Sequence, residues 1–294
     1  MSGIGFSIRN TQRSIMKLES IIGFLEEFAP PRLAEDWDNV GLLLGDRKNV
    51  VSKVMTCLTI TPDVIDEAVE RQVELIVAHH PMPFRPVKKI TTDSLVGTML
   101  WRMSRAGISV YSPHTAFDSA AGGINQLIAE KLQMDQVSPL QCSNDGNNQD
   151  HLNRSGLEGA GRQGMLPDAQ SASTLCRRLC SLFSLPLIQF CGDLDANVSK
   201  IAIGCGSGGQ FLADAVRTGC DSMITGEANF HTGLEAIACG VSLFLLSHYG
   251  SERFAVEALA DILAGEFSEL QVWVSQNERD PVQNILSVSD RPVD

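Results

Sequence analysis

The sequence predicts an α/β fold of two similar lobes, each with a mixed, largely parallel sheet flanked by helices. Short β-branched and apolar segments alternate with segments of helical periodicity, which is the pattern of parallel sheets. The succession strand, helix, strand, helix, strand occurs once in each half, and each copy ends in serine, histidine and a carboxylate. We therefore expect the lobes to form a pseudo-repeat, although chance similarity between two generic βαβ segments would also explain the pattern.

The composition is that of a folded, acidic protein. The 294 residues are 44% hydrophobic and 20% charged, which excludes wholesale disorder. A formal net charge of -12 disfavours binding to nucleic acid or to anionic membranes. No apolar stretch approaches the roughly 20 residues that a membrane span needs. The N-terminus lacks the apolar core of a secretory signal and none of the eight cysteines forms a CxxC pair, so we expect reduced thiols in a cytoplasmic protein.

The first lobe is expected over residues 17–140, after a disordered extension at 1–16. It begins with a helix at Leu18–Phe28, where apolar residues recur at helical spacing until two prolines stop the pattern. A loop at 33–46 then leads into a short strand. The remaining elements alternate, with strands at Val54–Ile60, Glu74–Ala78 and Ile108–Tyr111, and helices starting at Pro62 and spanning Ser94–Arg105 and Ile124–Leu132.

The second lobe is expected over residues 166–275. It follows a stretch at 141–165 that is rich in Asn, Gly, Ser and Gln, which indicates a linker or a surface loop. A loose polar tail at 276–294 ends the chain. The expected strands are Ile188–Cys191, Lys200–Gly204, Ser222–Thr225 and Val241–Leu246, and the expected helices are Thr174–Leu182, Gln210–Thr218, Thr232–Cys239 and Glu252–Ala264.

Two adjacent histidines, His79 and His80, end a predicted strand. Neighbouring residues of a strand point to opposite faces. Pro81 forces the chain to turn, which would let both imidazoles face one cavity. Taken alone, the pair could equally be a capping or solvent-exposed pair.

Two further histidines follow predicted strands, and each precedes a carboxylate by four residues. The pairs are His114/Asp118 and His248/Glu252, separated by the same offset in the two halves. A helical turn would place both members of a pair on one face. A single such pair is usually a surface hydrogen bond. Recurrence of histidine and carboxylate at strand ends, where α/β sheets bind ligands, instead predicts a divalent metal site between the lobes.

Three other motifs allow two interpretations each. Glu227 and His231 form a third pair of this spacing, which would either face a substrate or start a helix. The segment 37–39 (WDN) would brace the cleft or form a plain turn. The CGSGG loop at 205–209 is a poor match to a phosphate loop, because it lacks the GxGxxG spacing and the Walker lysine. Its small residues would also let the backbone approach another segment closely.

Taken together, the motifs resemble those of the NIF-three-like family, whose members are often labelled GTP cyclohydrolase I type 2 homologues. The similarity covers about residues 17–275. It is carried by EDWDNVGLLLGD (35–46), VAHHP (77–81), SPHTAFD (112–118), GCGSGG (204–209), ITGE (224–227) and SHYGSER (247–253).

The resemblance implies a dinuclear metal centre and a ring-shaped homohexamer. Glu252 would bridge both ions, and His114 would stand near them without being a ligand. The two ions, of Zn, Mn, Fe or Co, would divide the other ligands into the pairs His79 with His248 and His80 with Asp118.

Two functions from different classes fit these expectations. The first is a metal-dependent hydrolase in which Glu227 and His114 move protons and activated water attacks a nucleotide such as GTP or a related small molecule. The second is a non-catalytic metal-binding protein that regulates or binds partners. The sequence leaves open whether the chain is an enzyme.

Overall fold

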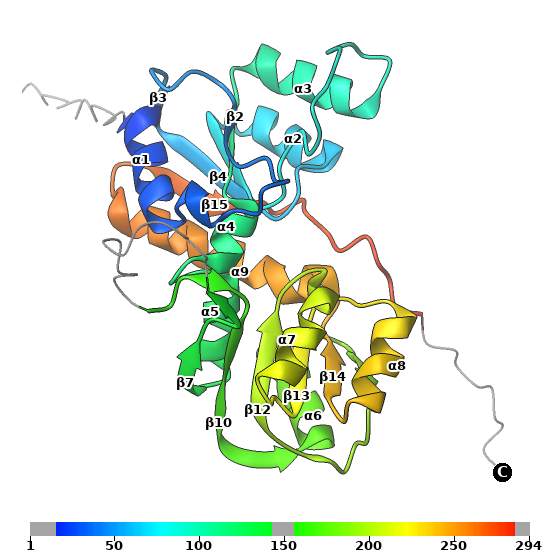
Figure 1. Cartoon of the computed structure of the whole chain (residues 1–294). Helices are drawn as coiled ribbons and strands as arrows, with labels where there is room; N and C mark the ends of the chain where they lie inside the picture. Colours follow the sequence, from blue (N-terminus) through cyan, green and yellow to red (C-terminus); the bar gives the residue numbers. More distant parts are fainter. Residues whose placement is uncertain (1–15, 143–155, 286–294) are drawn as a thin grey trace, which may run out of the picture.

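Two sheets and their helices make up the structure, a computed structural model that describes residues 16–142 and 156–285. The sheets lie in separate halves of the molecule, and the long helix α9 (His248–Glu266) runs between them (Figure 1). The predicted α/β class with mixed, largely parallel sheets is confirmed. The disordered extension expected at the N-terminus lies outside the described residues, except for Met16.

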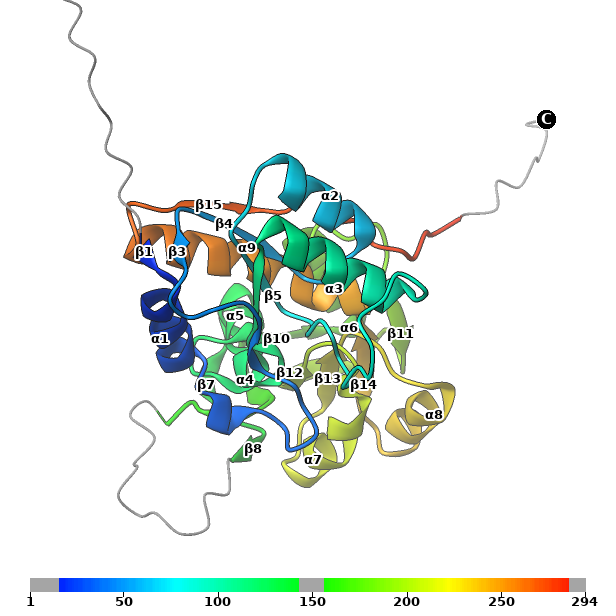
Figure 2. The same cartoon turned by 90° about the horizontal axis from the view of Figure 1, so that it is seen from above.

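The first sheet has the strand order β15-β4-β5-β6-β2. Its first four strands are parallel, and β2 pairs antiparallel with β6 at the edge. Helices α2 and α3 cover its outer face (Figure 2). The bounds are β15 Gln271–Val274, β4 Lys53–Cys57, β5 Leu75–Ala78, β6 Ser109–Ser112, β2 Gly41–Leu44, α2 Pro62–Glu70 and α3 Leu95–Ala106.

The second sheet has the order β11-β14-β13-β12-β10-β7. Its three middle strands β12, β13 and β14 are parallel, and the strands flanking them are antiparallel. Helices α7 and α8 cover its outer face. The bounds are β11 Gln189–Cys191, β14 Ser242–Leu245, β13 Ser222–Thr225, β12 Asn197–Gly204, β10 Arg162–Ser171, β7 Asp135–Ser138, α7 Leu212–Arg217 and α8 Phe230–Ala238.

The same unit is built twice, as the sequence predicts. In each half a helix and an antiparallel edge strand precede three parallel strands, and the edge strand pairs with the third of them: β2 with β6, and β11 with β14. A helix whose first residue is a histidine then follows, α4 (His114–Ser119) in one half and α9 in the other. The two histidine-led helices are therefore equivalent elements of a repeated topology.

The sheets exchange strands across the expected lobe boundaries. Strand β7 lies within 17–140 but joins the second sheet, and β15 lies within 166–275 but joins the first. Strand β10 begins inside the polar stretch 141–165. No apolar pattern marks its start because the buried guanidinium of Arg162 fills the interior there, donating to the carbonyls of Ala120, Gly159 and Gly161.

Most sheet residues are buried on both faces, which accounts for the continuous apolar runs of the strands. Val54 faces the layer between the sheets, and the next residue, Met55, faces the outer helices. Among the described residues, five helices contribute to one hydrophobic core in the layer between the sheets, giving five layers in the order α/β/α/β/α. These helices are α1 Leu18–Phe28, α4, α5 Ile124–Lys131, α6 Ala172–Leu182 and α9.

Local signals set several helix ends. Thr61 accepts a hydrogen bond from the amide of Val64 at the start of α2, and Ser94 accepts one from Gly97 at the start of α3. Gly107 ends α3 with a left-handed φ of 72°.

The short elements are β1 Met16–Lys17, β3 Val50–Val51, β8 Gln141–Cys142, β9 Gly159–Ala160 and the 3-10 turns Pro31–Leu33 and Gly208–Phe211. No helix in the described residues combines the length and apolarity that crossing a membrane requires.

The tail expected to be loose from residue 276 is instead tied to the first lobe at its start. The carboxylate of Glu278 is 4% exposed and accepts hydrogen bonds from the amides of Leu58 and Thr59. It also forms an ion pair of 2.9 Å with Arg253 of α9. Buried Glu67 accepts bonds from the amides of residues 276 and 277. Buried carboxylates thus hold a polar segment that carries no apolar pattern.

We expect Glu278→Ala to lower the free energy of unfolding by about 3 kcal/mol, because it leaves the largely buried Arg253 without its buried partner. Urea denaturation measures the change. The matched control is Glu257→Ala, which removes the exposed partner of the same guanidinium and should cost less than about 1 kcal/mol. Equal effects of the two substitutions would contradict the structural role of Glu278.

Candidate metal centre

The predicted histidines lie at the ends of parallel strands and come together in one place between the lobes. The amides of His79 and His80 continue the pairing of β5 with β4, bonding to the carbonyls of Cys57 and Leu58 at 3.0 and 2.8 Å. His114 follows β6 and His248 follows β14, each as the first residue of a helix. Asp118 and Glu252 lie one turn further on, on the same helix face as their histidine. All of these side chains therefore converge from both copies of the repeat.

The backbone is strained where the two histidine-led helices begin. His114 has a φ of 29°, and Ser247, the residue before His248, has a φ of 67°. Both values lie in the left-handed region, which residues other than glycine rarely adopt. The hydroxyl of Ser247 compensates by accepting a hydrogen bond from the amide of Gly250 at 3.0 Å. The strained turns aim the two imidazoles at the space between the sheets.

One cluster of ligand atoms joins the two lobes. Nε2 of His80 lies 3.2 Å from Oε2 of Glu252 and 3.2 Å from Nε2 of His248. Nε2 of His248 lies 3.2 Å from the same carboxylate oxygen. Two imidazoles and a carboxylate at these separations are a donor set suited to a first-row divalent ion.

The other oxygen of Glu252 belongs to a second cluster. Oε1 lies 3.8 Å from Nε2 of His79, and that nitrogen lies 3.7 Å from Oδ1 of Asp118. The side-chain atoms therefore group differently from the ligand pairs that the family resemblance implies: His80 lies with His248, and His79 lies with Asp118. The reason is that adjacent residues at a strand end diverge, so the two imidazoles fall on opposite sides of the Glu252 carboxylate.

His114 also points into the centre, although the sequence placed it near the metal without ligating it. A ligand nitrogen of His114 lies within 4.8 Å of ligand nitrogens of His79 and His80. Its Nδ1 is 2.7 Å from Oδ1 of Asp38, which leaves Nε2 free for a ligand. Burial opposes ionisation of Asp38, yet hydrogen bonds from His114 and Thr115 lower its pKa to about 2. The segment 37–39 therefore does brace the site.

Two further imidazoles are oriented in the same way. Nδ1 of His80 lies 2.6 Å from the hydroxyl of Thr59, and Nδ1 of His248 lies 3.0 Å from the carboxylate of Glu227. A partner on Nδ1 fixes the ring and turns Nε2 toward the ligand clusters. Thr59 was not predicted from the sequence, because its only signal is a polar residue just past a strand.

His79 provides an observation that favours a bound cation. Its imidazole is 1% exposed, and neither ring nitrogen has a hydrogen-bond partner among the described residues. An unpaired buried polar group is unfavourable unless a ligand satisfies it. Burial holds the pKa of His79 well below its usual 6.5, so the ring is neutral, which is the form that binds metal. The donors present therefore fit a metal centre.

The glycine loop at 205–209 packs against Glu252. Gly206 has a φ of 58°, and a Cβ at this position would lie 2.2 Å from Oε1 of Glu252. The amide of Gly206 donates to the hydroxyl of Ser251 at 3.0 Å, and its carbonyl accepts a hydrogen bond from the amide of Glu227. Of the two interpretations of this loop, close approach of the backbone is the one that the contacts support.

The two acidic ligands differ in electrostatics. Burial and the nearby charge of Glu252 raise the pKa of Asp118 to about 7, and the thiol of Cys205 donates a hydrogen bond to its Oδ1 at 3.3 Å. Burial alone would raise the pKa of Glu252, but the surrounding imidazoles hold it well below its usual 4.5. A cation would relieve the repulsion between these two carboxylates.

His231 is not part of the centre. It lies exposed in α8, and Glu227 bonds to His248 and to the hydroxyl of Ser207 instead. The third histidine–carboxylate pair of the sequence therefore does not form, because a loop separates Glu227 from the start of α8 at Phe230.

A family model described as Duf34/NIF3 (NGG1p interacting factor 3) matches residues 16–281. The chain belongs to the Duf34/NIF3 family. A GTP cyclohydrolase 1 type 2 homolog of Clostridium acetobutylicum is 34% identical, with 90% of this chain and 98% of the relative covered. A protein NIF3 homolog of Schizosaccharomyces pombe is 33% identical, with 90% and 96% covered.

Solved structures share the fold of this Duf34/NIF3 chain. Staphylococcus aureus protein SA1388 superposes with a TM-score of 0.81 at 25% identity, covering 92% of this chain and 99% of the other. Reduced HcgD from Methanocaldococcus jannaschii superposes with a TM-score of 0.75 at 24% identity, covering 89% and 98%. The second comparison supports the fold alone.

We expect chelator-treated protein to lose stability as the pH rises from about 7 to about 9. The hydrogen bond that His248 donates to the Glu252 carboxylate raises the pKa of His248 to about 9, so the stability that it contributes is complete below the usual pKa of 6.5 and is lost as the pH rises through 9. Burial raises the pKa of Asp118 from 3.8 to about 7, so ionisation of this carboxyl lowers stability mainly between about pH 4 and 7 and adds little above pH 7. The thermal unfolding midpoint at a series of pH values measures both effects.

Asp118→Asn should keep the decline between pH 7 and 9, which belongs to His248, and should lose the part below about pH 7 that belongs to Asp118. Saturating divalent cation should flatten the curve, because the cation takes the place of the protons. A midpoint that stays constant or rises between pH 7 and 9 in chelated wild-type protein would rule out this account of the charges.

Proposed function

We propose that this Duf34/NIF3 protein is a dinuclear metal-dependent hydrolase acting on a small molecule. The observation that carries the proposal is the position of Glu252, whose two carboxylate oxygens reach two separate groups of ligand atoms. The ligands are His80 and His248 on one side and His79 with Asp118 on the other, with His114 close to the second group. The names of relatives as GTP cyclohydrolase 1 type 2 homologs agree with a hydrolytic activity.

Bound divalent cations supply a Lewis acid and lower the pKa of water at the site. Glu227 is the best placed group to accept a proton. Its side chain is 57% exposed beside His248, and the hydrogen bond from the Ser207 hydroxyl lowers its pKa, so it is ionised at neutral pH. His114 is less suited to proton transfer, because Asp38 holds one ring nitrogen and the ring faces His79 and His80.

The donor set does not choose the metal. Imidazole and carboxylate suit Zn, Mn, Fe and Co alike, and availability decides among them.

The ring-shaped homohexamer also stays a prediction. An exposed apolar stripe on α8, formed by Phe230, Leu234 and Ile237, is a candidate contact between copies, and sedimentation of the purified protein tests the assembly.

We expect purified wild-type protein to contain about two divalent ions per chain and Glu252→Gln to contain less than about half as many, since one carboxylate serves both groups. Elemental analysis of protein prepared without chelator measures the content. His231→Ala, which changes a histidine outside the centre, should keep the wild-type content. Wild-type protein without metal would refute the proposed centre.

We expect Glu227→Gln to lower kcat about 100-fold while keeping the metal content, because the amide keeps a hydrogen-bond acceptor for His248 but cannot take a proton. The assay uses metal-loaded protein with GTP and with p-nitrophenyl esters and phosphodiesters. Glu235→Gln, on the exposed part of α8, is the control and should keep full activity. Metal-loaded wild-type protein that turns over none of these compounds would favour the non-catalytic metal-binding alternative.

A further inference from the structure

A cavity of about 1100 Å³ opens beside the metal centre. His80, His248 and Glu227 line one end of it. The walls come from α9, from the segment 182–189 before and within β11, and from residues 280–284 near the C-terminus. The cavity is thus built from segments far apart in the sequence and includes two of the proposed metal ligands.

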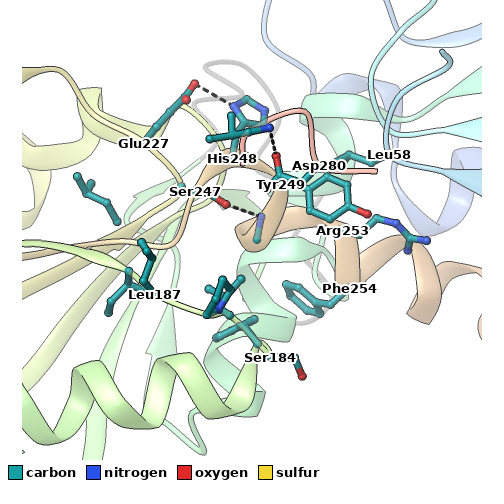
Figure 3. A pocket seen from close by; sticks show the side chains of 18 of the residues that line it. Leu58, Ser184, Leu187, Glu227, Ser247, His248, Tyr249, Arg253, Phe254 and Asp280 are labelled. Atoms are coloured by element: carbon teal, nitrogen blue, oxygen red, sulfur yellow. Dashed lines mark hydrogen bonds and ion pairs between the residues drawn. The ribbon is translucent and has the colours of Figure 1, made fainter. Parts of the chain in front are cut away.

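The character of the walls changes with distance from the centre. Figure 3 shows His248 and Glu227 together at one end, with Leu187 and Phe254 further away on different segments. Phe254 lies six residues after His248 on α9, which corresponds to about 9 Å along the helix axis. Most of the residues that line this part of the cavity are apolar. They include Leu182, Phe183, Leu185, Pro186, Leu187, Ile188 and Phe254.

The charges of the lining do not suit a polyanion. Three carboxylates line the cavity, those of Glu227, Glu257 and Asp280, against the cations Lys131 and Arg253. Arg253 is already paired with Glu278 and Glu257. A triphosphate would therefore meet little compensating charge away from the bound metals.

Lys131 is the lining cation that has no carboxylate partner within the described ranges 16–142 and 156–285. Its ammonium lies over the rings of Phe183 and Phe254, at 5.9 and 5.1 Å from their centroids. The two rings contact each other edge to face at 5.1 Å. One positive charge thus stands beside an aromatic pair at a distance from the metal centre.

We propose that the cavity binds an elongated molecule with a metal-binding polar head, an apolar or aromatic body and at most one acidic group at its far end. The head lies at His80 and His248, the body lies along Leu185, Leu187 and Phe254, and the acidic group faces Lys131. This inference rests on the proposed metal-dependent function and narrows its substrate class. It excludes nucleoside triphosphates as the preferred ligand.

Two hydroxamic acids test the proposal on metal-loaded protein by calorimetry. Acetohydroxamic acid carries the metal-binding head alone, and 4-phenylbutanohydroxamic acid adds an apolar chain and a ring. We expect the second compound to bind at least tenfold more tightly, because its apolar chain and ring are removed from water when they pack against the apolar wall of the cavity. GTP, measured in the same way, should bind more weakly than the phenyl compound.

Leu187→Glu introduces a charge into the apolar wall and should reduce the tenfold preference to less than twofold, with acetohydroxamic acid binding unchanged. Leu194→Glu is the matched control, since this exposed leucine lies outside the cavity, and should keep the preference. A terminal carboxylate on the phenyl ring should add affinity in wild-type protein and none in Lys131→Gln.

The outcomes separate the two proposals. Failure of both hydroxamic acids to bind would overturn the metal centre itself. Binding of both with equal affinity, tighter binding of GTP, or a preference that survives Leu187→Glu would overturn the cavity proposal and leave the metal centre intact.

Discussion

The structure depends on one buried carboxylate, that of Glu252, which is enclosed by imidazoles between the two lobes. A charged group removed from water is tolerated only when its neighbours supply compensating charge and hydrogen bonds. Here the neighbours come from both copies of the repeat: His79 and His80 from the first lobe, and His248 from the same helix. The glycine at position 206 leaves the space that this carboxylate needs. The relative position of the lobes is therefore coupled to the geometry of the centre.

Helix α9 provides that coupling. It follows β14 of the second sheet, carries His248 and Glu252 in its first two turns and then packs along β4 and β15 of the first sheet. The buried hydroxyl of Thr56 in β4 donates to the carbonyl of Val256 in its middle. Residues that could bind a metal and residues that hold the lobes together thus lie on one rigid element, which suits a site that must keep its ligands in place.

The repeat also explains why the two ends of the site differ. In the first lobe the histidine-led helix α4 is short, and Asp38 and Cys205 form hydrogen bonds with His114 at its start and Asp118 near its end. In the second lobe the equivalent helix is long, and the space beside it is the large cavity with apolar walls. One copy thus completes the ligand set, while the other supplies the surface that a substrate would contact. Membership of the Duf34/NIF3 family fixes the fold but does not by itself choose that substrate.

Local pattern alone determined the alternation of strands and helices, the start of α2 at Pro62, and the histidines and carboxylates that meet at the strand ends. These features follow from spacing and from the carboxyl ends of parallel strands, both of which are readable along the chain. Tertiary packing decided the rest. The grouping of His80 with His248, the part of Thr59 in orienting His80, and the exchange of β7 and β15 between sheets all join residues far apart in sequence. Long-range contacts set the direction of a side chain at a strand end and the partner of an edge strand. Such contacts leave no periodic signal in the sequence.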